Sequence, residues 1–81
     1  MKISVNTFGQ LTDFFEPKLS LEINENAPIG EVFEKLVEIN PQSKTLLENC
    51  RIAVDDNIIH EKEFNLKNNQ EVFIMPPFSG G

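Results

Sequence analysis

The chain has 81 residues, enough for one domain. A domain of this size buries only ~60–65% of the surface that its unfolded chain exposes, so its core is modest. Thirteen acidic residues against seven Lys and Arg give a net charge of −6, and the basic residues form no cluster. Nucleic acid and anionic membranes are therefore not expected as partners, whereas an acidic surface suits docking to a basic protein.

The apolar runs and the opening residues do not predict a membrane or secretory protein. Every apolar run falls short of the roughly 18 residues of a membrane span. The opening Met-Lys-Ile-Ser-Val lacks the parts of a signal peptide. The single cysteine, Cys50, excludes an internal disulfide and fits a reducing compartment. We therefore expect a cytoplasmic protein.

The first 23 residues predict a β-hairpin. Residues Lys2–Thr7 alternate between apolar and polar side chains, as a half-buried strand does. A short helical turn follows, which Pro17 ends. A second alternating stretch then predicts a strand that pairs with the first. The apolar residues that mark the turn and the second strand are Leu11, Phe14, Phe15, Leu19, Leu21 and Ile23.

One long amphipathic helix is expected in the middle of the chain. Five apolar residues recur at helical spacing, namely Ile29, Val32, Phe33, Leu36 and Val37. Asn26 is the expected N-cap, with Pro28 in the first turn. The Asn40-Pro41 pair is expected to end the helix. A further helical turn is predicted for Ser43–Leu47.

The C-terminal half predicts three more strands. Residues Arg51–Val54 and Ile58–His60 are expected to form a hairpin around the turn Asp55-Asp56-Asn57. The strand Glu71–Met75 is almost entirely apolar, which is typical of a central strand covered on both faces. In the polar stretch between them, Phe64 and Leu66 are expected to fill the underside of the core.

The order β-β-α-β-β, with the short stretch Ile58–His60 as a further return strand and one amphipathic helix, predicts an α+β fold of the β-grasp (ubiquitin-like) kind. Such a fold lays the helix across a mixed sheet of four or five strands. We expect residues 1–75 to form this domain and residues 76–81 to form an extended tail.

No internal catalytic site is predicted. The only histidine, His60, has no second ligand at metal-binding spacing. Cys50 has neither a CxxC partner nor a histidine close in sequence. The acidic residues Asp55 and Asp56 are explained by a hairpin turn. No resident metal or permanently bound cofactor is expected, and whether the chain counts as an enzyme stays open.

The last residues, Met75-Pro76-Pro77-Phe78-Ser79-Gly80-Gly81, carry the chemical hypothesis. Two prolines stop the strand ladder and extend the chain. Gly80 and Gly81 lack Cβ atoms, so a terminal carboxylate could enter a narrow active site. That carboxylate could attack the α-phosphate of ATP, form an acyl adenylate and receive sulfur as a thiocarboxylate.

This ending resembles the Phe-Pro-Pro-Val-(Ser/Thr/Ala)-Gly-Gly terminus of the molybdopterin synthase small subunit, in the MoaD/ThiS family of β-grasp sulfur carriers. The opening residues 3–11 resemble the first strand and Phe-(Ala/Gly) turn of that family. Residues 51–57 and 69–72 are similar to its later strand and turn regions. The similarity spans nearly the whole chain, and the tail is its most specific part.

The resemblance implies a partner set and a chemistry. The partners would be the large subunit of molybdopterin synthase, in a heterotetramer, and a ubiquitin-activating-like adenylyltransferase that uses ATP. Gly81 would carry the sulfur to precursor Z, Gly80 would give clearance, and the molybdopterin dithiolene would result. The residues expected to bind partners are Phe8, Ile58, Met75, Pro76, Pro77, Phe78 and Ser79. Alternatives are a carrier for thiamin, cysteine or tRNA thiolation, a ubiquitin-like protein modifier, and an interaction domain with incidental glycines.

Overall fold

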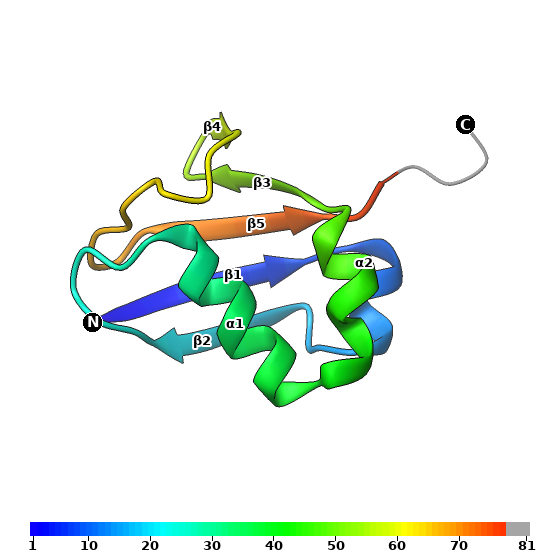
Figure 1. Cartoon of the computed structure of the whole chain (residues 1–81). Helices are drawn as coiled ribbons and strands as arrows, with labels where there is room; N and C mark the ends of the chain where they lie inside the picture. Colours follow the sequence, from blue (N-terminus) through cyan, green and yellow to red (C-terminus); the bar gives the residue numbers. More distant parts are fainter. Residues whose placement is uncertain (78–81) are drawn as a thin grey trace.

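The computed structural model describes residues 1–77 of the chain (Figure 1). In that part, five strands form one mixed sheet: β1 (Lys2–Thr7), β2 (Lys18–Glu22), β3 (Arg51–Val54), β4 (Asn57–Ile59) and β5 (Glu71–Met75). Two α-helices, α1 (Ile29–Ile39) and α2 (Lys44–Glu48), are accompanied by the 3-10 helices η1 (Gly9–Asp13) and η2 (Pro41–Ser43). The predicted sheet and main helix are confirmed.

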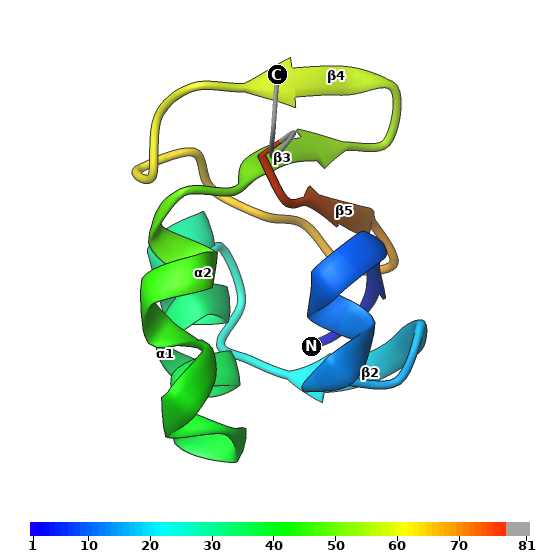
Figure 2. The same cartoon turned by 90° about the vertical axis from the view of Figure 1, so that its right-hand side faces the viewer.

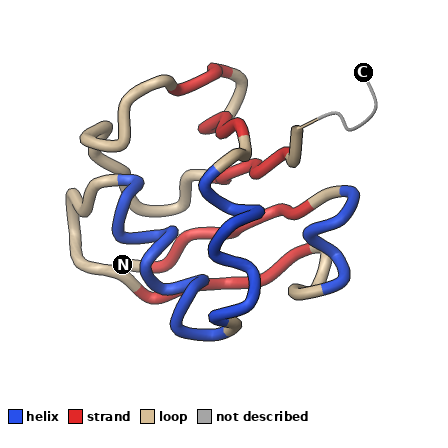
Figure 3. The backbone as a smooth tube through the Cα atoms, turned by 45° about the vertical axis from the view of Figure 1, so that its right-hand side comes forward, coloured by secondary structure: helices blue, strands red, loops and turns tan. Residues whose placement is uncertain are grey.

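The strand order is β2-β1-β5-β3-β4, so β5 is the central strand, as predicted. Strand β5 runs parallel to β1, and the remaining neighbours are antiparallel. Helices α1 and α2 lie against the same face of the sheet (Figure 2). The chain leaves β5 at the end of the sheet where β1 enters η1 (Figure 3). The fold therefore brings the start of the tail beside the first turn.

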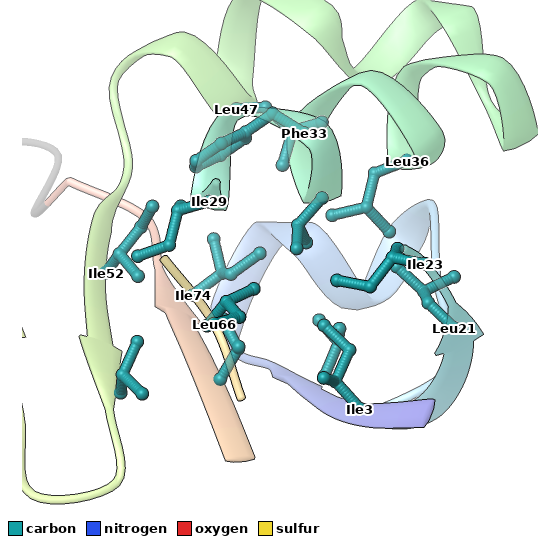
Figure 4. Close-up of a cluster of buried hydrophobic side chains, with 14 of the residues drawn as sticks. Ile3, Leu21, Ile23, Ile29, Phe33, Leu36, Leu47, Ile52, Leu66 and Ile74 are labelled. Atoms are coloured by element: carbon teal, nitrogen blue, oxygen red, sulfur yellow. The ribbon is translucent and has the colours of Figure 1, made fainter. Parts of the chain in front are cut away.

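The core lies between α1 and the sheet. Figure 4 shows Phe33 and Leu36 of α1 pointing toward sheet residues that include Ile3 and Ile74. Leu36, Ile3 and Ile74 are at most 1% exposed. Fully burying one such side chain stabilises the fold by about 1.5–3 kcal/mol relative to leaving it in water. The predicted helical stripe is confirmed, with Val37 half-buried at its margin.

The start of α1 differs from the prediction. Pro28, not Asn26, is the N-cap residue, and its side chain makes no capping hydrogen bond. Asn26 instead takes a left-handed backbone conformation with φ 59°. The first N–H groups of the helix are satisfied by another segment: Ile29 donates to the carbonyl of Phe64 (2.9 Å) and Gly30 to that of Lys62 (3.1 Å). A tertiary contact thus replaces the local side-chain cap.

Two further expectations need correction. Leu66 is fully buried, but the Phe64 side chain is 36% exposed, because this segment contributes its backbone to α1 rather than that ring to the core. Strand β4 starts one residue early: Asn57 pairs with Val54, so the hairpin turn contains only Asp55 and Asp56. Asp55 supplies the positive φ, 53°, that this tight turn requires.

Within residues 1–77, no helix is both long enough and apolar enough to cross a membrane.

Candidate functional site

The sheet face opposite the helices is open in the described part of the chain. Strand β5 shows this most clearly, because Val72 and Ile74 are fully buried on the helix side while Phe73 and Met75 are only half-buried on the other. The prediction that β5 is covered on both faces is therefore wrong for residues 1–77. A central strand with one apolar face only partly covered by its own domain can bury that face against a partner.

Five apolar residues form a continuous group on this open face, called here the open-face patch: Phe8, Ala53, Ile58, Phe73 and Met75. The register aligns Ile58, Ala53 and Phe73 in one row across β4, β3 and β5. The Phe8 ring stacks on Phe73, with ring centroids 6.4 Å apart and planes 18° apart. Phe8 and Ile58 are 45% and 51% exposed.

The patch brings together three residues that the sequence analysis named for partner binding, namely Phe8, Ile58 and Met75. It also contains Phe73, which the sequence analysis missed. The signal for Phe73 was present in the alternation of β5, where residues 71, 73 and 75 share one face. That alternation was obscured because both faces of the strand carry apolar side chains.

The other half of the open face is polar and internally connected. The Asn6 side-chain amide donates to the Glu71 carboxylate (3.1 Å) and to the Val72 carbonyl (3.3 Å). The Lys18 ammonium lies 3.5 Å from the same carboxylate. This network borders the patch, since Asn6 pairs directly with Phe73 across β1 and β5.

Charge is distributed unevenly between the open face and the rest of the molecule. By strand alternation, the open face carries three of the seven basic residues and two of the thirteen acidic ones: Lys2, Lys18, Arg51, Glu22 and Glu71. The acidic surplus therefore lies elsewhere on the chain.

The tail begins at the edge of this patch. Pro76 follows β5 and lies against the turn after β1, where a Cβ atom built on Gly9 would come within 3.0 Å of the Pro76 Cγ. Pro76 is half-buried and Pro77 is exposed. The predicted site residues Phe78, Ser79, Gly80 and Gly81 lie outside the described residues. The structure thus places the predicted tail base and patch side by side.

The other candidate chemical groups have structural roles in the described chain. Burial raises the pKa of the Cys50 thiol to about 11 from an ordinary 9.0, and the thiol donates to the Leu46 carbonyl (3.2 Å). That thiol is therefore protonated and weakly nucleophilic at neutral pH. The Asp55 carboxylate accepts from the Glu71 N–H (3.2 Å), which fixes the start of β5. Among residues 1–77 no group of three or more His, Cys, Asp or Glu residues could hold a metal ion.

The five-stranded mixed sheet, with one main helix on a single face, defines the class of the protein: a β-grasp, ubiquitin-like domain. Residues 5–81 match the model of the ThiS family. The chain therefore belongs to the ThiS family, within the MoaD/ThiS group of sulfur-carrier and ubiquitin-like proteins. No curated protein sequence gave a significant match.

Solved structures agree with this assignment. A chain in the complex of subunits 1 and 2 of the molybdopterin-converting factor from Helicobacter pylori is 25% identical, with a TM-score of 0.72 and 100% of each chain covered. SAMP1 from Haloferax volcanii is 16% identical, with a TM-score of 0.85 and 100% of each chain covered. The small archaeal modifier protein 1 from Methanosarcina acetivorans is 22% identical, with a TM-score of 0.83, covering 99% of this chain and 96% of that one. At the two lower identities the likeness is one of fold.

Proposed function

We propose that this chain is a sulfur carrier that acts as the small subunit of molybdopterin synthase. The observation that carries the proposal is the place where the tail begins: Pro76 directly follows Met75 of the open-face patch and lies against Gly9, the neighbour of Phe8. A partner that covers Phe8, Phe73 and Met75 meets Pro76 at the same edge, and the tail is then directed into that partner. The H. pylori complex of subunits 1 and 2 supports a large-subunit partner of this kind.

The chemistry takes place on the main-chain carboxylate of Gly81. A carboxylate has a reference pKa of about 3.3–3.7 at a C-terminus, so it is ionised at neutral pH. One of its oxygens attacks the α-phosphorus of ATP on the activating enzyme, and pyrophosphate leaves. A sulfide-level donor then attacks the acyl carbon, and AMP departs with the bridging oxygen. The product is a thiocarboxylate, in which sulfur has replaced one oxygen.

Sulfur transfer requires the thiocarboxylate to reach a second active site, on the large subunit. Gly80 and Gly81 present no side chains, so they fit a narrow channel. The thiocarboxylate sulfur passes to precursor Z, and water restores the carboxylate. ATP is consumed on the activating enzyme, so the carrier itself needs no resident cofactor.

The patch supplies the docking energy in this scheme. Phe8, Ile58 and Met75 offer apolar area at its centre, and Pro76 to Ser79 add the contacts of the tail. Interfaces of this kind concentrate affinity in a few well-buried apolar and aromatic residues. Phe8 is the leading candidate, because its exposed ring is already held in place against Phe73.

A second candidate function is a protein modifier. It is favoured by the fold similarity to SAMP1 and to the small archaeal modifier protein 1. The same Gly81 acyl adenylate would then be attacked by a lysine amine, and an isopeptide bond would form with loss of AMP. Both functions use the same Gly81 acyl adenylate, and they differ in the nucleophile that attacks its acyl carbon.

Intact mass spectrometry tests the carrier chemistry. The full chain is incubated with ATP, sulfide and a ubiquitin-activating-like enzyme from the same organism. We expect a gain of ~16 Da at the C-terminus, where sulfur replaces oxygen. A variant without Gly81 and one extended by a single residue are the controls, and both should remain unchanged. If the full chain gains no mass, or if either control gains it, the proposal fails.

A further inference from the structure

The tail leaves β5 by crossing the turn that follows β1, and Gly9 occupies the crossing point. Its φ of +56° is a left-handed conformation that L side chains rarely adopt. Independently, a Cβ at this position would meet the Pro76 Cγ at 3.0 Å, closer than carbon atoms normally pack. Backbone conformation and space thus both restrict residue 9.

The turn around Gly9 is anchored, so it cannot easily move away from Pro76. The Thr12 hydroxyl donates to the Gly9 carbonyl (2.7 Å), and the Leu11 N–H donates to the Phe8 carbonyl (3.1 Å). Leu11 is fully buried, and the Phe8 ring stacks on Phe73. Pro76, by contrast, is the first residue after the strand ladder. A side chain at position 9 would therefore displace Pro76 rather than the turn.

We propose that Gly9 is a positioning residue for sulfur transfer: it lets Pro76 pack directly against the turn, so that the tail and the open-face patch engage one partner together. This inference rests on the proposed function. If Pro76 is displaced, the partner can bind either the open-face patch or the tail in the optimal position, but not both at once. The loss therefore falls on KM for the carrier, while kcat is retained once the two terminal glycines are in place.

The test uses Gly9→Asn, Pro76→Ala and the double variant. Asparagine adds the Cβ but tolerates a left-handed φ, as Asn26 and Asn69 do in this chain at 59° and 69°. Alanine at position 76 has no Cγ, so the contact is lost in that background. The thiocarboxylated carriers are assayed for sulfur transfer to precursor Z by the large subunit, and thermal unfolding is followed in parallel.

We expect Gly9→Asn to raise KM about tenfold with kcat nearly unchanged, since small misplacements of a reacting chain are costly. In the Pro76→Ala background the same substitution should raise KM no more than about twofold, because residues in contact give non-additive effects. Thermal unfolding should show that every variant remains folded at the assay temperature. An equal rise in KM in the two backgrounds, or no rise in either, would overturn the proposal.

A readout independent of activity separates this inference from the proposed function. The wild-type chain should give a nuclear Overhauser cross-peak between the Gly9 Hα and Pro76 Hγ protons. Absence of that cross-peak overturns the placement of Pro76 and the inference with it. If the cross-peak is present but the thiocarboxylated wild type transfers no sulfur, the proposed function is refuted and the contact at Gly9 stands.

Discussion

The two faces of the sheet differ in how far residues 1–77 bury them. On the helix side, Val72 and Ile74 of β5 are fully buried against α1 and the loops. On the open side, Phe73 and Met75 of the same strand are only half-buried. Alternate residues of a single strand therefore differ in burial, and the proposed function assigns recognition to the less buried set. The comparison teaches that apolar character alone does not identify the core, because side-chain direction decides which task a residue has.

The largest expected effect on stability comes from the covered face. Leu36→Ala removes a fully buried side chain and leaves a cavity, so the free energy of unfolding should fall by about 2–5 kcal/mol. Ile39→Ala, at the exposed end of α1, is the matched control and should change it by less than about 0.5 kcal/mol. Urea unfolding measures both. Equal losses for the two variants would contradict the assignment of the core.

A substitution on the open face should instead weaken partner binding and leave the free energy of unfolding nearly unchanged. Ile58→Asp places a charge in the patch and should weaken binding to the large subunit by about 2 kcal/mol or more, at little cost in stability. Ile39→Asp adds the same charge at a site of similar exposure on the helix side, 56% against 51%, and should leave binding unchanged. Isothermal titration calorimetry measures the affinities. Similar losses of affinity for both variants would show that the added charge, rather than its place in the patch, weakens binding.

The polar half of the open face should contribute less to the free energy of unfolding than the core does. Lys18→Ala removes the ion pair with Glu71, whose side chains are 63% and 45% exposed. Exposed pairs of this kind contribute about 0.2–1 kcal/mol, so a small loss of stability is expected, and it should shrink in high salt. Urea unfolding at low and high ionic strength checks this. A large loss that is insensitive to salt would place Lys18 in a structural role.

An effect confined to alkaline pH concerns Cys50, whose raised pKa of about 11 is caused by desolvation on burial. Between pH 9 and 11 the unfolded thiol loses its proton while the folded thiol keeps it, so unfolding becomes more favourable as the pH rises. The stability advantage of the wild type over Cys50→Ala should therefore narrow across this window. Urea unfolding at pH 8 and pH 11 measures the change. If the stability difference between the wild type and Cys50→Ala is the same at both pH values, burial does not raise the pKa of this thiol.

The strands and the main helix were predictable because their patterns are local. The alternation of Lys2–Thr7 and the apolar stripe of α1 are each complete within one segment. The structure reproduces the bounds of that strand and the end of α1 before Asn40, although not the predicted start of the helix. The candidate site was named in part: Phe8, Ile58 and Met75 came from the resemblance, and the fold brings them to one face. That they bind a partner stays a prediction.

What could not be predicted depends on contacts between distant segments. The N-terminus of α1 is satisfied by carbonyls of Lys62 and Phe64, more than thirty residues away, so its local sequence suggested the wrong cap. The same contact leaves the Phe64 ring outside the core. The close approach of Gly9 and Pro76 was also missed, because the two residues lie at opposite ends of the chain.

The central claim is that the tail and the open-face patch together deliver sulfur to molybdopterin synthesis. The most direct measurement mixes the thiocarboxylated chain with the large subunit and precursor Z, and follows molybdopterin together with the intact mass of the carrier. The account predicts that molybdopterin forms as the carrier loses the ~16 Da gained on sulfuration, and that Ile58→Asp slows this step strongly. A thiocarboxylate that forms but is never consumed in this mixture would contradict the assignment to molybdopterin synthase.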